Sequence, residues 1–270
     1  MSSSDLDVDA VTALVEHVAA TVVAPRFRDL RDGEVREKAP GDVVTVVDTE
    51  AEAALVRGLA EIAPGVPVVA EEAAAARPEL LDLIVGASRV WVVDPLDGTQ
   101  AFVDGSPDHA VMVGLIEHGE AVGGWICLPE HGETFVAQRG SGAFRNGQRL
   151  PPTTPPTDLA ALRGGLATWH VPPQMRQRLD ASGFGPGVTT GRLWSGYHYS
   201  RMASGAADFL LYWRTWPWDH TPGAVLLREV GGVSRRLDGT DYRPDAVGQG
   251  LLAAADDATY AMVRDHLALG

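Results

Sequence analysis

Two helical patterns of apolar positions occupy the first sixty-odd residues. Residues 6–23 place apolar side chains three or four positions apart, which gives a helix with one apolar face, and Pro25 stops or bends it. A second pattern begins at Thr49-Glu50-Ala51-Glu52, which has the form of a capping box, and ends at Pro64-Gly65. The recurring positions are Val11, Leu14, Val15, Val18 and Val22, then Leu55, Val56, Leu59 and Ile62.

From residue 66 to residue 138 the pattern changes to that of strands. Residues 66–70 and 89–93 are short apolar runs, and each leads into acidic residues. Three β-rich runs follow at 109–117, 120–128 and 133–138, with short turns between them. This order predicts a sheet with a meander of neighbouring strands.

A proline-rich segment, Pro151-Pro152-Thr153-Thr154-Pro155-Pro156, is the strongest linker signal in the chain. Strand-like and helix-like segments alternate after it, and a helical pattern runs from about residue 256 to residue 269. We therefore predict an α+β N-terminal subdomain over residues 1–150 and an α/β C-terminal subdomain over residues 157–270.

Charge and cysteine content exclude several classes of protein. The chain has 22 Lys and Arg against 36 Asp and Glu, a formal net charge of −14, and this field would repel nucleic acid and anionic membranes. Cys127 is the only cysteine, so an intrachain disulfide and a zinc site with several thiolates are excluded, and we assign Cys127 to packing. We see no secretory signal and no run of about 18 apolar residues, so we expect a cytoplasmic protein.

The most informative stretch runs from Val90 to Thr99. A buried strand delivers Asp94 to Pro95-Leu96-Asp97-Gly98, and a turn there would place Asp94 and Asp97 on one side with the Leu96 carbonyl between them. Hard cations such as Mg²⁺ prefer oxygen ligands of this kind. Thr99 would open a helix whose N–H groups face a phosphate. The alternative is a surface Asp-Gly turn without a ligand.

Three further acidic positions follow the same logic. Glu71-Glu72 ends an apolar strand, Asp48 ends the run 42–47, and Asp219 precedes a helical pattern over residues 224–230. Each has a structural alternative: solvation of a strand end for Glu71 and Asp48, and a helix N-cap for Asp219. Four such positions in order favour one shared site.

At this point the sequence resembles the inositol monophosphatase family of Mg²⁺-dependent, lithium-sensitive phosphatases, over about residues 10 to 255. The resemblance implies a layered αβαβα fold, usually dimeric. The matching motifs are Asp-Val-Val-Thr-x-x-Asp (42–48), Glu-Glu (71–72), Asp-Pro-Leu-Asp-Gly-Thr-x-x-Phe (94–102), the turn 140–147, and Trp-Asp (218–219) followed by Gly231-Gly232.

The resemblance implies a set of metal ligands. Glu71, Asp94 and the Leu96 carbonyl would hold a first Mg²⁺, and Asp94, Asp97 and Asp219 a second, with a third, weaker ion near Glu71. Converging carboxylates repel one another, and two or three Mg²⁺ ions cancel that charge. Two ions roughly 3.5–4 Å apart clamp the attacking and leaving oxygens of an in-line displacement.

The same resemblance implies how phosphate and water are held. Gly98 and Thr99 would bind the phosphate, and Thr99 with Asp48 would orient the attacking water, so Asp48, Thr99 and Glu71 are the expected catalytic residues. Phosphoryl transfer of this type depends on positioning and charge stabilisation, so no side-chain nucleophile is needed.

The substrate side departs from the family pattern. Gln100-Ala101 stands where the family often has Asn or a charged residue, and Tyr212 stands where animal inositol monophosphatases have an inositol-binding Glu. The segment from Arg192 to Tyr199 is more aromatic than usual and resembles the histidinol-phosphate phosphatase branch. The predicted substrate-binding residues are Gly98, Thr99, Gln100, Arg192 and Tyr212.

Other chemistry-bearing residues receive structural interpretations. Mg²⁺ disfavours imidazole, so we assign His220 to packing or hydrogen bonding rather than ligation, and His198 is only a secondary candidate for substrate contact. We place Trp213, Trp216 and Trp218 in the core or at a subunit interface rather than on a stacking platform.

These observations give one main hypothesis: a Mg²⁺-dependent phosphomonoesterase that hydrolyses a small polyol or sugar phosphate by metal-activated water attack, as a homodimer. Alternative substrates for the same site are histidinol phosphate, a 3′-phosphonucleotide and fructose bisphosphate. A rival of another class is a non-catalytic sensor of metal and anion, against which the intact pair Asp48 and Thr99 argues.

Overall fold

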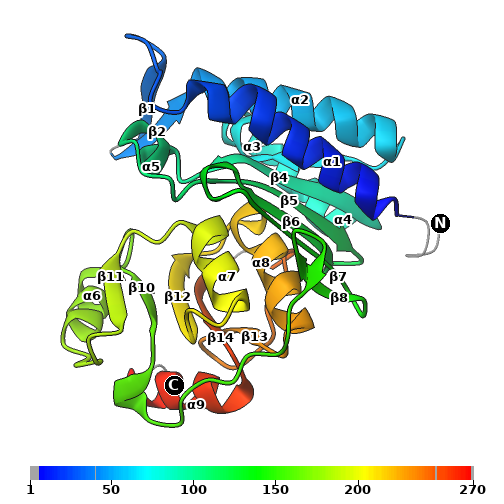
Figure 1. The fold of residues 1–270 in the computed structure, drawn as a ribbon. Coiled ribbons are helices and arrows are strands. Elements are labelled where there is room, and N and C mark those ends of the chain that lie inside the picture. Colours follow the sequence, from blue (N-terminus) through cyan, green and yellow to red (C-terminus); the bar gives the residue numbers. More distant parts are fainter. Residues whose placement is uncertain (1–5, 40, 247, 269–270) are drawn as a thin grey trace.

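The computed structural model describes residues 6–39, 41–246 and 248–268. Helices and sheets stack in alternating layers: helices, a seven-stranded sheet, helices, a five-stranded sheet and helices (Figure 1). This arrangement is the αβαβα sandwich that the family resemblance predicts.

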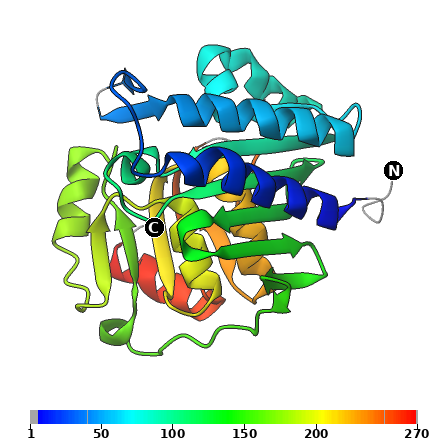
Figure 2. The ribbon, with the colours of Figure 1, turned by 45° about the horizontal axis from the view of Figure 1, so that its top comes forward.

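The N-terminal half builds the seven-stranded sheet and the helices on its outer face. The strand order is β3-β4-β5-β6-β7-β8-β9, with β3 and β4 parallel and every other neighbouring pair antiparallel. Figure 2 shows α1 and α2 running across the same face of this sheet, where they contact each other. The elements are α1 (Val8–Val18), β1 (Val35–Ala39), β2 (Asp42–Thr45), α2 (Val46–Ile62), β3 (Val68–Ala70), α3 (Glu71–Ala76), α4 (Asp82–Gly86), β4 (Arg89–Asp97), α5 (Thr99–Val103), β5 (Ala110–Glu117), β6 (Glu120–Leu128), β7 (Glu133–Gln138), β8 (Gly142–Arg145) and β9 (Gln148–Arg149).

The C-terminal half builds the five-stranded sheet, in the order β11-β10-β12-β14-β13. Strand β10 pairs parallel with β11 and β12, and β14 pairs antiparallel with β12 and β13. The elements are β10 (Gly164–Ala167), α6 (Pro173–Asp180), β11 (Val188–Gly191), α7 (Ser195–Ala203), β12 (Phe209–Arg214), α8 (Pro217–Glu229), β13 (Val233–Arg236), β14 (Gln249–Ala254) and α9 (Asp257–His266).

Helices α7 and α8 form the central layer and are covered by both sheets (Figure 1). Their side chains join a core cluster that takes Met112 and Ile126 from one sheet and Leu210 from the other. Gly124 on β6 allows the close approach, because a Cβ there would lie 2.5 Å from the Pro222 carbonyl oxygen of α8. The two halves therefore share a core, and the segment 151–156 connects their sheets in the chain.

Most predicted strands of the meander are confirmed, and several helix boundaries are wrong. Strand β7 matches 133–138, and β5 and β6 match within a residue. The capping box predicted at 49–52 is wrong: α2 begins three residues earlier, with Thr45 as N-cap and Asp48 as its partner. Helix α8 likewise begins at Pro217 rather than near residue 224, because proline is well suited to the first helical turn.

The N-terminal helical stretch bears on the expectation that the chain has no apolar run of about 18 residues. In the described part of the chain, the helical stretch Val8–Arg26 is long and apolar enough to cross a membrane, judged by length and composition alone. In the fold its Val11, Val15 and Val18 are fully buried and join the core cluster with α2 and the seven-stranded sheet. One face of the stretch thus packs on the core within the outermost layer, while 28% of its apolar window is buried.

Candidate active site

One cavity of about 170 Å³ gathers the predicted acidic residues. It lies where the β1–β2 hairpin, the C-terminal ends of β4 and β12, and the first turn of α8 meet. Its lining includes all five proposed metal ligands, namely Glu71, Asp94, Leu96, Asp97 and Asp219. Segments up to 148 residues apart in the sequence thus meet at one site, as the motif order predicts.

An irregularity in β4 sets the directions of Asp94 and Asp97. The sequence suggests a turn after Asp94, but the strand continues through Asp97. Asp94 lies opposite Met112 and Asp97 opposite Ala110, so three residues on β4 match two on β5. Because side chains alternate along a strand, this extra residue puts both carboxylates on the same face of the sheet.

The start of α7 holds the Asp97 carboxylate in place. The Ser195 hydroxyl donates to Asp97 Oδ1 at 2.8 Å, and the backbone N–H groups of Ser195 and Gly196 donate at 3.2 and 2.8 Å. Burial raises the pKa of Asp97 to about 6, although these hydrogen bonds oppose the rise. Ser195 is a positioning residue that the sequence analysis missed.

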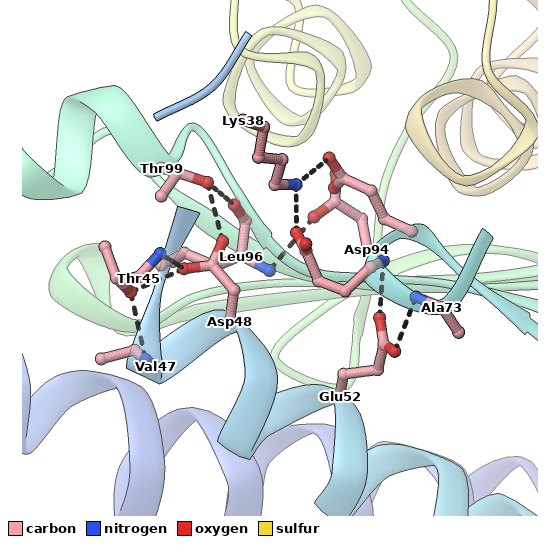
Figure 3. A network of polar contacts seen from close by, with 11 residues as sticks. Lys38, Thr45, Val47, Asp48, Glu52, Ala73, Asp94, Leu96 and Thr99 are labelled. Carbon is pink, nitrogen blue, oxygen red and sulfur yellow. Dashed lines mark hydrogen bonds and ion pairs between the residues drawn. The ribbon is translucent and has the colours of Figure 1, made fainter. Parts of the chain in front are cut away.

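Thr99 and Asp48 form the predicted pair at the edge of the cavity. The Thr99 hydroxyl lies 2.9 Å from Asp48 Oδ1 and 3.0 Å from the Leu96 carbonyl oxygen (Figure 3). Asp48 is buried, and its other oxygen accepts hydrogen bonds from the Thr45 N–H and hydroxyl at 2.8 and 2.6 Å. The capping box of α2 therefore fixes the carboxylate that holds Thr99.

Gly98 supplies the backbone geometry just before Thr99. Its φ is +80°, a left-handed conformation that glycine adopts without strain, and it precedes the short helix α5. A Cβ at this position would also lie 3.2 Å from the Asp108 carbonyl oxygen and 3.3 Å from the Trp194 ring. The backbone conformation thus favours glycine, and the space around a Cβ would be tight.

Lys38 on β1, the only lysine in the chain, contacts the acidic residue Glu71 that lines the cavity. Its ammonium group pairs with Glu71 Oε1 at 3.2 Å and also with Glu72 (Figure 3). Burial lowers the pKa of Lys38, but the two carboxylates outweigh this and the net direction is upward. Burial and the Glu71 charge raise the pKa of Glu72 to about 7.

Glu52 on α2 anchors the helix that carries Glu71. Its carboxylate accepts the backbone N–H groups of Glu72 and Ala73 at 2.8 and 3.0 Å (Figure 3). These donors belong to the first turn of α3, whose N-cap residue Ala70 has no side chain to bond them. The sequence pattern placed Glu52 in a local capping box, whereas it caps a different helix.

The buried acids favour a divalent cation. Burial, followed by the charges of Glu71, Asp97 and Asp219, raises the pKa of Asp94 well above its usual range. The pKa of Asp219 is raised by burial and by the same neighbours, and Arg214 opposes the rise. Carboxylates and a backbone carbonyl form the all-oxygen donor set that Mg²⁺ prefers, so the residues present fit this ion.

The acidic side chains of the cavity have protein groups as partners. Within the described ranges, no three Asp, Glu, His or Cys side chains converge closely enough to hold a metal. Glu71 instead pairs with Lys38, and Asp97 bonds to the start of α7. The assignment of individual ligands therefore stays a prediction, supported by the shared cavity and the mutual repulsion of the acids.

The substrate side of the cavity contains each predicted residue. Gln100, Arg192 and Tyr212 line it together with Gly98 and Thr99. Gln100 donates to Asp104 at 2.8 Å. The Tyr212 side chain is only 5% exposed, and its hydroxyl has no hydrogen-bond partner among the described residues.

The histidines and tryptophans lie partly as expected. His220 hydrogen bonds to the Tyr199 hydroxyl at 3.1 Å and to the Arg214 carbonyl oxygen at 3.0 Å, which is the predicted bonding role. Trp216 and Trp218 stack with a ring distance of 5.4 Å. Both also line the cavity, as do Trp213, Trp169 and Trp194, so the substrate pocket is more aromatic than the sequence analysis proposed.

Comparison with known proteins identifies the family. The model of the inositol monophosphatase family matches residues 6–268. The inositol-1-monophosphatase ImpA of Mycolicibacterium smegmatis is 32% identical over 269 residues, covering 93% of this chain and 91% of the relative. That of Bacillus subtilis is 31% identical over 208 residues, covering 75% and 76%. The chain belongs to the inositol monophosphatase family.

Membership fixes the reaction class. Members of this family hydrolyse phosphate monoesters, so this chain is a phosphomonoesterase. A relative from Chlorobaculum parvum, 32% identical over 178 residues and covering 63% of this chain and 64% of its own, is named histidinol-phosphatase. Among solved structures, the Thermotoga maritima IMPase shares the fold, with a TM-score of 0.78, 23% identity and coverage of 97% and 98%.

Proposed function

We propose that this family member hydrolyses the phosphate ester of a small polyol or sugar at the cavity between its two halves, using two or three Mg²⁺ ions. The observation that carries the proposal is the Thr99–Asp48 hydrogen bond beside the buried acids. A sensor without activity would have no need to keep a hydroxyl oriented toward the metal-binding end.

The chain's own residues would act by positioning. Bound Mg²⁺ would activate a water molecule and stabilise the charge on the leaving oxygen. The Thr99 hydroxyl donates a hydrogen bond to Asp48. The oxygen of this hydroxyl therefore keeps a lone pair that can accept a hydrogen bond from the attacking water and orient it. The N–H groups at the start of α5, beginning at Thr99, would donate to the phosphate. The water oxygen bonds to phosphorus, the ester P–O bond breaks, and the leaving alkoxide takes up a proton.

Histidinol phosphate is the second candidate substrate. Tyr212 replaces the acid that binds polyol hydroxyls in animal relatives, and aromatic side chains line the pocket. An imidazole ring would pack against these side chains, whereas a polyol offers hydroxyl groups.

Phosphate release from a panel of esters tests these alternatives. The panel contains inositol, sugar, histidinol and nucleotide phosphates, each assayed with Mg²⁺, without Mg²⁺ and with added Li⁺. One dominant kcat/KM identifies the substrate, and inhibition by Li⁺ supports the family mechanism. Mg²⁺ and phosphate binding without release from any ester would favour the sensor instead.

Two further features belong to the proposal. We infer a homodimer, because the resemblance implies one, and sedimentation analysis of the purified protein tests it. We also infer a cytoplasmic location, and cell fractionation tests it.

A further inference from the structure

One wall of the active-site cavity is cationic, in contrast to its acidic end. Arg192 and Arg214 supply its positive charge, and His170 lies with them as a mainly neutral imidazole in the lining of the same cavity as the acids. Burial lowers the pKa of His170, both arginines lower it further, and Asp42 opposes the shift. In a chain with a net charge of −14, this wall is a local exception.

Arg192 is held rigidly with donor groups to spare. Its guanidinium carbon lies 3.7 Å from the centre of the Trp169 ring and 5.7 Å from that of Trp194. One nitrogen donates to the Gly41 carbonyl oxygen at 2.5 Å. No carboxylate of the described residues pairs with Arg192, so its other N–H groups remain for a ligand.

Arg214 and His170 complete this wall. Arg214 is the last residue of β12, is exposed, and lies 5.9 Å from the Trp216 ring centre without an ion-pair partner in the described chain. His170 contacts Trp169 edge-on, with 4.9 Å between ring centres. Asp42 also lines the cavity, yet it forms no ion pair with either arginine within the described ranges.

A simple polyol phosphate leaves this wall without a partner. Its single phosphate belongs at the acidic end, where the metal ions would neutralise the carboxylates. Its hydroxyls carry no charge to match two guanidinium groups. Arginine forks fit carboxylate and phosphate oxygens in pairs, and stacking on tryptophan orders the fork before binding.

We propose that Arg192, Arg214 and His170 form a subsite for a second anionic group of the substrate. This inference rests on the proposed function and narrows it: the physiological ester carries a phosphate or a carboxylate in addition to the phosphate that is cleaved. Trp169, exposed at 39%, marks the entrance of this subsite.

Matched pairs of esters test the subsite. The pairs are fructose 1-phosphate with fructose 1,6-bisphosphate, adenosine 2′-phosphate with adenosine 2′,5′-bisphosphate, and glycerol 3-phosphate with 3-phosphoglycerate. For at least one pair we expect the member with the additional anionic group to have a kcat/KM about ten- to a hundredfold higher, since a charged hydrogen bond contributes roughly that factor. A preference in either of the first two pairs indicates that the subsite binds a phosphate, and a preference in the third pair indicates a carboxylate. Product analysis identifies the bond cleaved.

Variants separate the subsite from the reacting centre. Arg192→Gln and Arg214→Gln should each reduce the preference within that pair about tenfold, and the double variant should abolish it. Arg178→Gln, an exposed arginine on α6 outside the cavity, makes the same change in net charge and should keep the preference. Equal losses for both members of the pair would mean that the arginines bind the cleaved phosphate, which would overturn the subsite.

Binding measurements keep the two proposals distinct. Calorimetry with Mg²⁺ gives the Kd of each ester whether or not it is hydrolysed. A Kd preference for the second anion without any phosphate release would retain the subsite and reject the hydrolytic function. Hydrolysis with no preference in any pair, in kcat/KM or in Kd, would retain the function and reject the subsite.

Discussion

At the scale of single residues, Asp94 is a buried carboxylate surrounded by other acids. It is 2% exposed and lies beside the charges of Glu71, Asp97 and Asp219, so its ionised form depends on a neighbouring cation. Thr99 has a different role, because its hydroxyl joins the buried Asp48 to the cavity. The two residues therefore predict different kinetic defects.

Asp94→Asn should lower kcat/KM by roughly a thousandfold or more, because metal ions supply several kcal/mol of transition-state stabilisation. The variant should still fold, since the amide removes charge repulsion. Phosphate release and thermal unfolding measure the two effects. Asp82→Asn on the exposed surface of α4 is the matched control. A wild-type rate in Asp94→Asn would show that the ligand assignment is wrong.

Thr99→Val should lower kcat by roughly a hundred- to a thousandfold with a smaller change in KM, since orientation of the water is lost while the backbone N–H groups remain. Thr99→Ser keeps the hydroxyl and should retain most of the rate. Steady-state kinetics on the best substrate measure both. Equal rates in the Val and Ser variants would exclude a role for the hydroxyl.

At the scale of elements, the site depends on helix beginnings held by side chains from other elements. Glu52 on α2 bonds the first turn of α3, and Asp97 on β4 bonds the first turn of α7. Each contact satisfies N–H groups that have no partner within their own helix. The positions of the metal-binding residues therefore depend on these hydrogen bonds between elements.

Glu52→Ala should destabilise the protein by about 1–3 kcal/mol, because two partly buried N–H groups lose their acceptor. It should also raise the Mg²⁺ concentration needed for half-maximal rate, since α3 carries Glu71. Urea unfolding and a Mg²⁺ titration of the rate measure these effects. Glu50→Ala, two residues earlier on the exposed side of α2, should change stability by less than about 0.5 kcal/mol. A Glu52→Ala variant that matches Glu50→Ala in both assays would contradict this anchoring role.

At the scale of the whole molecule, the cavity stores charge repulsion that depends on pH. The ordinary pKa of an aspartate is 3.8, and that of Asp97 in the folded protein is about 6. Between these values the folded state binds more protons than the unfolded state, so the free energy of unfolding falls as pH rises. The shift of Asp97 alone corresponds to roughly 3 kcal/mol. The raised pKa of Asp94 extends the loss to higher pH.

In EDTA, the Tm should therefore fall as pH rises from about 4 to above 6, and millimolar Mg²⁺ at pH 7.5 should restore it. Asp97→Asn should flatten the pH dependence, whereas Asp82→Asn, which removes the same formal charge at the surface, should not. Thermal unfolding followed by circular dichroism measures these effects. A Tm in EDTA that stays constant or rises over this range would contradict the predicted repulsion.

The sequence by itself determined the reaction class and the β5–β7 meander, and it named acids that the fold places in one cavity. Those features follow from short sequence motifs and from the local pattern of apolar and polar residues, which do not depend on distant contacts. Helix starts were less well determined, as the capping box at Thr45 shows, because competing local signals lie only a few residues apart.

Only the tertiary structure decided how those residues work together. The strand irregularity that aligns Asp94 with Asp97, the Lys38 contact with Glu71 and the cap that Glu52 provides all join parts of the chain without a shared pattern. The stack of Arg192 on Trp169 joins residues 23 positions apart in the same way. Such contacts arise from how layers pack against one another, and no local spacing encodes them.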